Sequence, residues 1–277
     1  MKLLQIQPVF QARNDSALPG YLGSMLRGIF GRTLREYDAG LYDKFFHPRI
    51  AASNPAFKYT GTNPPAPFMI SPAHQMQFIR HGETIKFTLT LFGEYRLYEP
   101  QIREVFHRMA ERKWYHNRLR VAFQSVSVLT TATGKPVFDW DDYRQITASG
   151  SRLHLAFQTP VALMHNRRLI GDWTFSRLFD YLYRRMFILD HAYDQGTLPE
   201  NHGLDFAQNP VSPVTIDVRR HTVFRHPARK QKHPMTGWKG KVIYDGNISP
   251  LYPYFLFGRY IHIGNYTVFG FGKYLLK

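Results

Sequence analysis

The sequence predicts an α+β fold made of two ferredoxin-like (RRM-like) units in tandem, each with the element order βαββαβ. Two observations carry this prediction. In each half of the chain, segments with alternating apolar residues enclose longer segments that have the apolar period of a helix. The length of 277 residues also suits two domains of ordinary size. We therefore place the first domain at residues 1–130, a linker at 131–150 and the second domain at 151–277.

The first half supplies all six elements of such a unit. Strands are predicted at 3–10, 67–72, 84–92 and 119–129, and helices at 19–36 and 100–113. Pro8 indicates that the first strand is an edge strand or is interrupted, because proline cannot donate to a strand ladder. Residues 38–67 are rich in Pro, Gly, Asn and Ala and show no period, so a loop is predicted there.

The second half repeats this order, although no sequence repeat accompanies it. Strands are predicted at 151–159, 214–218 and 269–274, and helices at 173–193 and 251–263. Asp172 is the predicted cap of the longer helix, and Ser249 followed by Pro250 is the predicted start of the shorter one. Gly264 is expected to end the shorter helix in a left-handed conformation.

Charge is the strongest global signal. Thirty-six Lys and Arg residues oppose twenty Asp and Glu residues, which gives a net charge of +16. Such an excess repels itself unless the protein binds a polyanion. The chain also has 22 Phe and 17 Tyr residues, whose rings can stack on unpaired bases. RNA is therefore the predicted partner, and an anionic membrane surface is a distant alternative.

Other features of the composition narrow the class of protein. There is no cysteine, so disulfides and thiolate metal sites are excluded. No run of eighteen apolar residues is present and the N-terminus does not resemble a signal peptide, so we expect a soluble, cytoplasmic protein that contacts no membrane. Nucleotide-binding and zinc-protease motifs are absent, and the acidic residues do not cluster as a two-metal site requires. No metal or other cofactor is predicted.

Two basic segments in the second half are predicted to contact RNA. Between Asp217 and Asp245 there are eight Lys or Arg residues and no acidic residue, and flanking strands make this segment a long hairpin. In the helix at 173–193, basic residues and Tyr181 recur on one face. The alternatives are a flexible basic loop and a solvated helix face. The candidate RNA-binding residues from both segments are Arg177, Arg184, Arg185, Arg219, Arg220, Arg225, Arg229, Lys230 and Lys232.

The C-terminal residues 249–274 contain a glycine-rich turn. Gly264, Gly270 and Gly272 permit positive φ and let a backbone approach a ligand closely. Beside Arg259 and Lys273, such a turn can bind a phosphate through its backbone amides. We therefore predict that these five residues contact RNA, and the alternative is a tight turn that binds nothing.

This tail resembles the C-terminal glycine-rich signature of the CRISPR-associated RAMP endoribonucleases that process precursor crRNA. Asn265 and Tyr266 depart from the signature, at positions where the family has a basic and a small residue. Segments 237–244 and 248–250 also resemble the strand and the helix start that precede it. The matching residues are His262, Ile263, Gly264, Thr267, Phe269, Gly270, Phe271, Gly272, Lys273 and Tyr274.

The helix at 19–36 resembles the first helix of the same family. Its segment 23–35 follows the family pattern Leu-Arg-Gly-apolar-Phe-Gly, but Arg32 stands where many members have histidine. Three glycines in one helix each cost about 1 kcal/mol relative to alanine, which indicates a close approach to a sheet or to an RNA backbone. Arg27, Arg32 and Arg35 are predicted to position RNA and stabilise charge, as in the arginine-rich type IV processing enzymes. A solvated basic face is the alternative.

The resemblance implies an endoribonuclease, and the residues favour one that needs no metal. Such an enzyme removes the 2′-OH proton, stabilises the phosphorane with a cation and protonates the departing oxygen. The products carry a 5′-hydroxyl and a 2′,3′-cyclic phosphate. Imidazole suits the roles of acid and base, and His47, which follows the first helix, is the candidate.

The resemblance also implies partners. These are the crRNA repeat stem-loop, whose cleaved product the protein would retain, and other subunits of a CRISPR effector complex. Two alternatives stay open at this point. One is a crRNA-binding RAMP subunit that does not cut, and the other is an unrelated RNA-binding or RNA-modification module.

Overall fold

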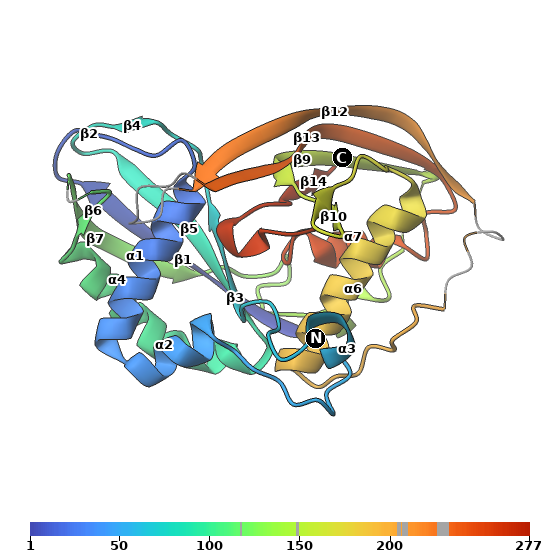
Figure 1. Ribbon diagram of the computed structural model, residues 1–277, viewed down its shortest axis with the longest axis horizontal. Helices are drawn as coiled ribbons and strands as arrows, with labels where there is room; N and C mark the ends of the chain where they lie inside the picture. The colour runs from blue at the N-terminus through green and yellow to red at the C-terminus, as the bar shows by residue number, and fades with distance from the viewer. Residues whose placement is uncertain (117, 148–149, 204–205, 207–209, 226–232) are drawn as a thin grey trace.

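The structure is a computed structural model that describes residues 1–277 except 117, 148–149, 204–205, 207–209 and 226–232. Figure 1 shows two antiparallel sheets side by side, each with its own helices. The strands of each sheet and its two main helices follow one another in the order βαββαβ. The predicted α+β fold of two tandem ferredoxin-like units is confirmed.

The first sheet has its N-terminal strand in the middle. Its strands lie in the order β3 (Phe68–Pro72), β5 (Thr84–Phe92), β1 (Lys2–Ala12), β7 (Leu119–Val128) and β6 (Lys113–Trp114). Helices α1 (Leu22–Tyr37) and α4 (Glu99–Ala110) supply apolar side chains to one core cluster with this sheet. β1 is thus central and not an edge strand, although its register with β7 shifts between Val9 and Phe10, one residue after Pro8. A bulge there lets the ladder tolerate the missing amide.

The segment predicted as a loop at 38–67 contains two helices, α2 (Ala39–Phe46) and α3 (Phe57–Thr60), so the loop prediction is wrong there. The Asp38 carboxylate caps α2 by accepting from the Leu41 amide at 2.9 Å. Leu41 and Phe45, four residues apart, are the buried residues of this helix and pack into the first core cluster. The remaining short elements of this half are β2 (Ser16–Ala17), β4 (Phe78–Ile79) and a 3-10 helix, η1 (Gly93–Tyr98).

The second sheet repeats the strand arrangement of the first. Its order is β12 (Val211–Arg225), β13 (His233–Gly246), β9 (Arg152–Val161) and β14 (Tyr274–Leu276), so that the first and third strands of each unit are central. The predicted strand at 214–218 is part of a much longer hairpin, in which β12 and β13 pair from Val211 opposite Gly246 to Arg225 opposite His233. We call this β12–β13 pair the basic hairpin.

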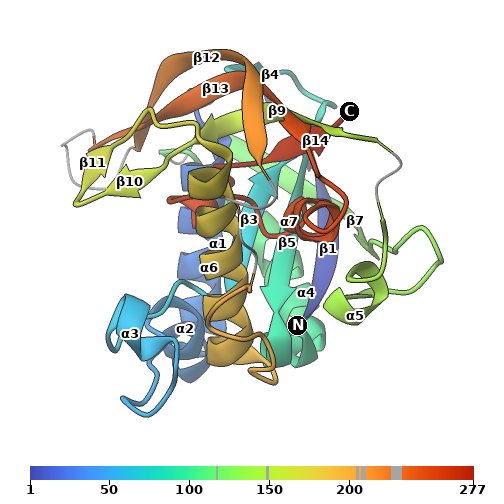
Figure 2. The ribbon, with the colours of Figure 1, turned by 90° about the vertical axis from the view of Figure 1, so that its right-hand side faces the viewer.

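Two helices, α6 (Phe175–Tyr193) and α7 (Tyr252–Gly258), pack with the second sheet (Figure 2). Thr174 is the residue before α6, and Asp172 supports this start by accepting from the Thr174 amide at 3.0 Å. α7 starts after Leu251 and not at Ser249, and it ends six residues before Gly264. The strand predicted at 269–274 begins only at its last residue, Tyr274, because Gly270 and Gly272 have φ of +88° and +73°. A short 3-10 helix, η2 (Thr267–Phe269), and a turn stand there instead.

The segment predicted as a linker, 131–150, packs against both halves. It contains β8 (Val137–Asp139), which pairs with β1, and α5 (Trp140–Tyr143), whose Trp140 and Tyr143 rings contact Phe257 of α7. A small hairpin, β10 (Met164–His165) and β11 (Arg168–Leu169), precedes α6.

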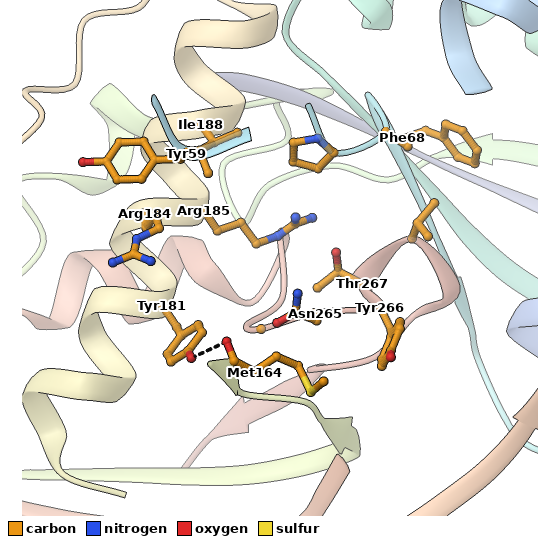
Figure 3. A pocket seen from close by; sticks show the side chains of 14 residues that line it. Tyr59, Phe68, Met164, Tyr181, Arg184, Arg185, Ile188, Asn265, Tyr266 and Thr267 are labelled. Carbon is orange, nitrogen blue, oxygen red and sulfur yellow. Dashed lines mark hydrogen bonds between the residues drawn. The ribbon is translucent and has the colours of Figure 1, made fainter. Parts of the chain in front are cut away.

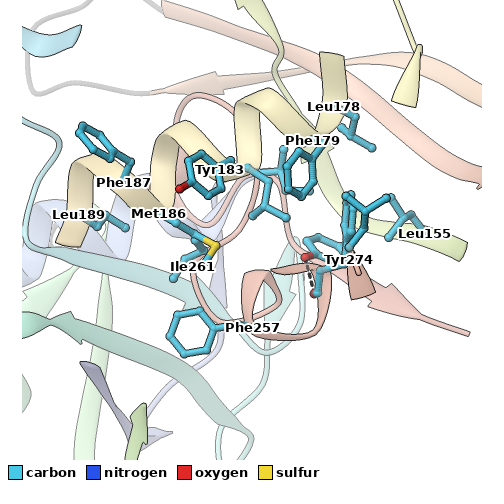
Figure 4. Packing of buried hydrophobic residues seen from close by; sticks show 14 of the residues in the cluster. Leu155, Leu178, Phe179, Tyr183, Met186, Phe187, Leu189, Phe257, Ile261 and Tyr274 are labelled. Atoms are coloured by element: carbon cyan, nitrogen blue, oxygen red, sulfur yellow. Dashed lines mark hydrogen bonds between the residues drawn. The ribbon is translucent and has the colours of Figure 1, made fainter. Parts of the chain in front are cut away.

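The larger core cluster joins the two halves. Side chains of α6 such as Leu178, Phe179 and Met186 pack with those of α7 and the second sheet (Figure 4). Leu3 and Phe92 of the first sheet belong to the same cluster. The junction between the halves is therefore built of buried apolar contacts. Among the described residues, no helix is both long and apolar enough to span a membrane.

Candidate active site and RNA interface

The glycine-rich segment 262–273 lies at the junction of the halves and is braced from within. His262 is buried at φ +64°, and its Nδ1 donates to the Phe271 carbonyl at 2.9 Å. Burial lowers the pKa of His262 to about 3, so the ring is neutral near pH 7. A buried, neutral ring that is bonded to the backbone is suited to hold the turn and not to exchange protons with a substrate.

The glycines of the turn pack against the protein itself. The Gly270 amide donates to Thr267 at 2.7 Å and the Gly272 amide to Pro160 at 2.8 Å. A Cβ at Gly270 would lie 2.8 Å from the carbonyl oxygen of Ile70 in β3, and one at Gly272 would overlap a backbone carbonyl. These two amides are therefore not free to bind a phosphate, which corrects that part of the prediction. The two glycines shape the turn instead.

Gly264, Lys273 and Arg259 have different surroundings. Gly264 lines a cavity on the outer side of the turn. Lys273 donates its backbone amide to the Thr159 hydroxyl at 2.9 Å, and burial lowers the pKa of its side chain. Arg259 donates from Nε to the Leu256 carbonyl at 3.1 Å, and its guanidinium stacks on Tyr260.

The N-terminal end of α1 lies directly on this turn. A Cβ at Gly23 would overlap the Phe269 carbonyl oxygen, so glycine is required for this approach. Near the middle of the helix, a Cβ at Gly31 would lie 2.7 Å from the ring of Phe46 in α2. Gly28, in contrast, faces open space. Two of the three helix glycines thus have the close approach that the sequence indicated.

A continuous row of cations and rings extends from the turn along α1 and α2. The Arg27 guanidinium lies between the rings of Phe269, at 5.2 Å, and Phe46, at 4.6 Å. Phe46 stacks on Tyr42 with their centroids 4.6 Å apart, and Tyr42 in turn contacts Arg35 at 5.7 Å and His47 at 5.6 Å. We call this row the arginine–aromatic strip; its members are Arg27, Arg35, Tyr42, Phe46, His47 and Phe269.

Arg32 lies outside this strip. It follows Arg27 by five residues, which places it about 140° further around the helix. Partial burial, and then the nearby charge of Arg32, lower the pKa of Arg112, which itself pairs with Glu36. The structure therefore brings Arg27, Arg35 and His47 together and places Arg32 with a different set of charges.

Sequence reasoning missed Tyr42 and Phe46, because it assigned their segment to a loop. A signal was present, since Asp38 is a good helix cap and Leu41 and Phe45 are spaced four residues apart. The eight-residue helix is short, and the surrounding residues are rich in Pro, Gly and Asn.

The predicted arginines of α6 separate into three environments. Arg177 is half-buried and pairs with Asp172 at 3.4 Å. Arg184 lies over the ring of Tyr59 at 5.4 Å. Arg185 is buried and donates from Nε to the Ile261 carbonyl at 2.7 Å. Burial raises the pKa of Tyr181 and the charges of Arg177 and Arg184 lower it, so these three side chains share one face of α6 as expected. Arg185 lies on the buried side of the helix instead.

The basic hairpin presents its charges to solvent. Arg219 and Arg220 are exposed on β12, and Arg225 is the last residue of that strand. Arg229, Lys230 and Lys232 lie outside the described residues. Arg219 and Arg220 therefore remain candidates for binding the RNA backbone.

A cavity of about 350 Å³ opens between α6, the glycine-rich turn and the segment around Tyr59 (Figure 3). Arg184 and Arg185 reach it from α6, and Gly264, Asn265 and Thr267 from the turn. We call it the α6 cavity. In the part of the chain that the structure describes, no group of three or more His, Asp or Glu side chains is placed to hold a metal ion.

Two family models cover almost the whole chain. Residues 155–274 match the CRISPR-associated endoribonuclease Cas6, and residues 1–150 match AF_1859_N, an N-terminal domain. No curated protein sequence matches the chain.

Solved Cas6 structures share the fold. Thermus thermophilus Cas6 (TTHB231) has a TM-score of 0.61 at 16% identity, over 99% of this chain and 98% of that one. A Cas6 (TTHB231) product complex has a TM-score of 0.64 at 16% identity, over 99% and 100%. A partial Cas6-RT-Cas1–Cas2 complex has a TM-score of 0.65 at 14% identity, over all of this chain and 46% of that chain.

The family match agrees with the fold. The matched residues 155–274 contain the second sheet, α6 and the glycine-rich turn, and the matches to Cas6 structures extend over both halves. An unrelated RNA-binding or RNA-modification module is thereby excluded. The matched residues 155–274 therefore form a domain of the Cas6 family, the CRISPR-associated endoribonucleases that process precursor crRNA.

Proposed function

We propose that this chain cuts precursor crRNA on the 3′ side of a repeat stem-loop without a metal ion, and that it cuts at the arginine–aromatic strip. The observation that carries this proposal is the contact of Arg27 with both Phe269 of the turn and Phe46 of α2. It joins two cations and an imidazole to the glycine-rich turn along one surface. The reaction needs cations that contact the phosphate and a group that transfers protons. Aromatic rings can in addition stack on the bases of the RNA.

The reaction assigns a step to each group. The 2′-oxygen of the substrate loses its proton and attacks the adjacent phosphorus, and the bond from phosphorus to the 5′-oxygen breaks. His47, which is exposed at the end of α2, exchanges protons with these oxygens. Arg27 and Arg35 stabilise the charge on the phosphorane. The 5′-oxygen leaves as a hydroxyl, and the other product carries a 2′,3′-cyclic phosphate.

The two halves contribute different parts of this site. We propose that residues 1–130 and 151–277 are the two domains of the enzyme and that 131–150 connects them. Arg27, Arg35 and His47 then belong to the first domain and Phe269 to the second. Cutting would depend on how the domains meet.

Solved Cas6 proteins include a product complex, a substrate-mimic complex and a Cas6-RT-Cas1–Cas2 complex. We propose that this chain likewise binds a crRNA repeat stem-loop in the cytoplasm, retains the cut product and associates with other CRISPR subunits. The exposed Arg219 and Arg220 of the basic hairpin are suited to bind the phosphates of the stem.

Cleavage of a labelled repeat RNA in excess EDTA tests the mechanism. We expect one cut, with a 5′-hydroxyl on one product and a cyclic phosphate on the other. A single 2′-deoxy nucleotide at the cut should abolish cleavage and leave binding intact, because the attacking oxygen is gone. Cutting of the deoxy substrate, or cutting only with added metal, would contradict the proposal.

Two arginine variants test the position of the site. Arg27→Ala should slow single-turnover cleavage by about a hundredfold, the range for the loss of one preorganised donor, while stem-loop binding changes little. Arg32→Ala should slow it less, since Arg32 is off the strip. The reverse order would place the site at Arg32, as its position in the first helix predicted. A wild-type protein that binds the RNA and never cuts would favour a binding-only subunit.

A further inference from the structure

The α6 cavity contains a buried cation that no acidic side chain among the described residues neutralises. The Arg185 side chain is only 9% exposed, and within the described parts of the chain it takes part in no ion pair. One nitrogen, Nε, donates to the Ile261 carbonyl at 2.7 Å, and the guanidinium lies 5.7 Å from the ring centre of Phe92. Burial lowers its pKa to about 9, which leaves it charged at neutral pH.

Burying a charge without a counter-charge costs free energy. The cavity next to the Arg185 guanidinium is therefore a candidate site for an anion that would neutralise this charge. Figure 3 shows the Arg185 guanidinium directed toward the turn, on the side of Thr267 and Asn265. The terminal nitrogens of a guanidinium form a fork that fits two oxygens of a phosphate. The part of the cavity around Arg185 therefore has the chemistry of a phosphate site.

The remaining walls suit a base and a sugar. Tyr59, Tyr181 and Tyr266 line the cavity, together with apolar side chains. The hydroxyl of Tyr181 donates to the Met164 carbonyl at 2.8 Å, which fixes that ring in the wall. A volume of about 350 Å³ is at the small end of the range for ligand pockets, which is the size of a single nucleotide and not of a helix.

The cavity also has a continuation. Tyr59 and Arg184 line both the α6 cavity and a second one of about 490 Å³ on the other side of their stacked pair. The two spaces therefore adjoin at this pair, and the second is also lined by Lys58 and His202 beside the carboxylates of Asp180 and Glu200. This arrangement fits a nucleotide that is part of a chain better than a free one.

We propose that the α6 cavity takes one unpaired nucleotide of the RNA, turned out of its strand, with its phosphate on Arg185 and its base among the tyrosines. The inference rests on the proposed function in one respect, that the ligand is RNA. It adds a recognition point outside the arginine–aromatic strip, which selects where an unpaired segment of the substrate lies.

RNAs with one neutral methylphosphonate linkage, placed in turn at each unpaired position, test the phosphate contact. In wild type, one such position should weaken binding about tenfold or more. In Arg185→Gln that same position should have no further effect, because the contact is already lost. Arg177→Gln is the matched control on the same helix: Arg177 is half-buried, pairs with Asp172 and does not line the cavity, so this variant should keep the wild-type sensitivity.

A second variant covers the case in which Arg185→Gln does not fold. Asn265 is exposed and lines the cavity, so Asn265→Trp should fold and fill the space while Arg185 itself is unchanged. It should remove the tenfold sensitivity at the same position, and also the loss of binding caused by an abasic nucleotide there.

The outcomes separate this inference from the proposed mechanism. If no linkage is sensitive in wild type, or if the sensitivity survives in both cavity variants, the inference is overturned, whether or not the RNA is still cut in EDTA. Binding of AMP alone that depends on Arg185, with no sensitive linkage in the RNA, would also overturn it in favour of a free-nucleotide site. Loss of cutting alone would leave it standing.

Discussion

Two alanine substitutions in α1 test the packing on which the arginine–aromatic strip depends. An added Cβ at Gly28 meets nothing within 4 Å, whereas at Gly31 it would lie 2.7 Å from the tip of the Phe46 ring. That ring has little room to move, since it stacks on Tyr42 at 4.6 Å and lies 5.1 Å from Phe68. The two positions are in the same helix and differ in what covers them.

The magnitudes follow from these surroundings. Alanine is preferred over glycine in a helix by about 1 kcal/mol, so Gly28→Ala should raise the free energy of unfolding by that amount. Gly31→Ala makes the same gain, but it overpacks a ring contact, which costs about 1–3 kcal/mol. The variants should therefore differ by about 1–3 kcal/mol. Each kcal/mol shifts Tm by about 2–4 °C in proteins of 150–250 residues, so thermal unfolding separates them.

Cleavage should separate them further. Displacement of Phe46 moves the ring on which Arg27 lies, and misplacement of about 1 Å in a catalytic group can cost about a hundredfold in rate. We expect Gly28→Ala to cut at the wild-type rate and Gly31→Ala to be at least about tenfold slower in single-turnover assays. Equal stability and equal rates in the two variants would refute the reasoning.

Two further predictions concern the turn and the hairpin. Burial lowers the pKa of His262 from 6.5 to about 3. As pH falls, the unfolded chain is therefore protonated at His262 before the folded protein is. The stability that the neutral, buried His262 contributes is present above about pH 6.5 and is lost as pH falls toward 3. His262→Asn, which suits φ +64° and can donate to Phe271 but cannot be protonated, should lose less unfolding free energy between pH 7 and pH 4 in denaturant titrations; an equal loss would assign the pH dependence elsewhere. Replacing Arg219 and Arg220 by alanine should reduce the salt slope of RNA binding by about 2, one for each lost phosphate contact, and an unchanged slope would remove them from the interface.

The sequence was sufficient for the order of elements and for the family. Alternation and helical period are local properties, so strands such as 84–92 coincide with the observed β5, and the helix at 173–193 differs from α6 by two residues. The predicted limits are less accurate for elements whose ends depend on tertiary contacts. The predicted strand at 214–218 is fifteen residues long, because β13 supplies a partner for each further residue of β12.

The candidate site was predictable only in part. Helical phase shows that Arg27 and Arg32 point in different directions, but it does not show that Phe269, more than two hundred residues away, covers one of them. Likewise, the glycines of α1 predicted that another segment packs closely against this helix, but not which segment it is. For Arg185 the sequence shows a charge in a helix, and only the fold shows that the charge is buried.

The glycine-rich turn connects both parts of the proposed RNA path. On one side Phe269 contacts Arg27 of the strip, and on the other Asn265 and Thr267 line the α6 cavity. The turn is tied to β9 through Thr159, which donates to the Gly270 carbonyl at 2.7 Å. Because one braced segment forms both places, their separation is fixed. A nucleotide held in the cavity would therefore determine which later phosphate reaches the strip. Glycines whose amides are already bonded would then serve cleavage by setting this spacing and not by touching the RNA.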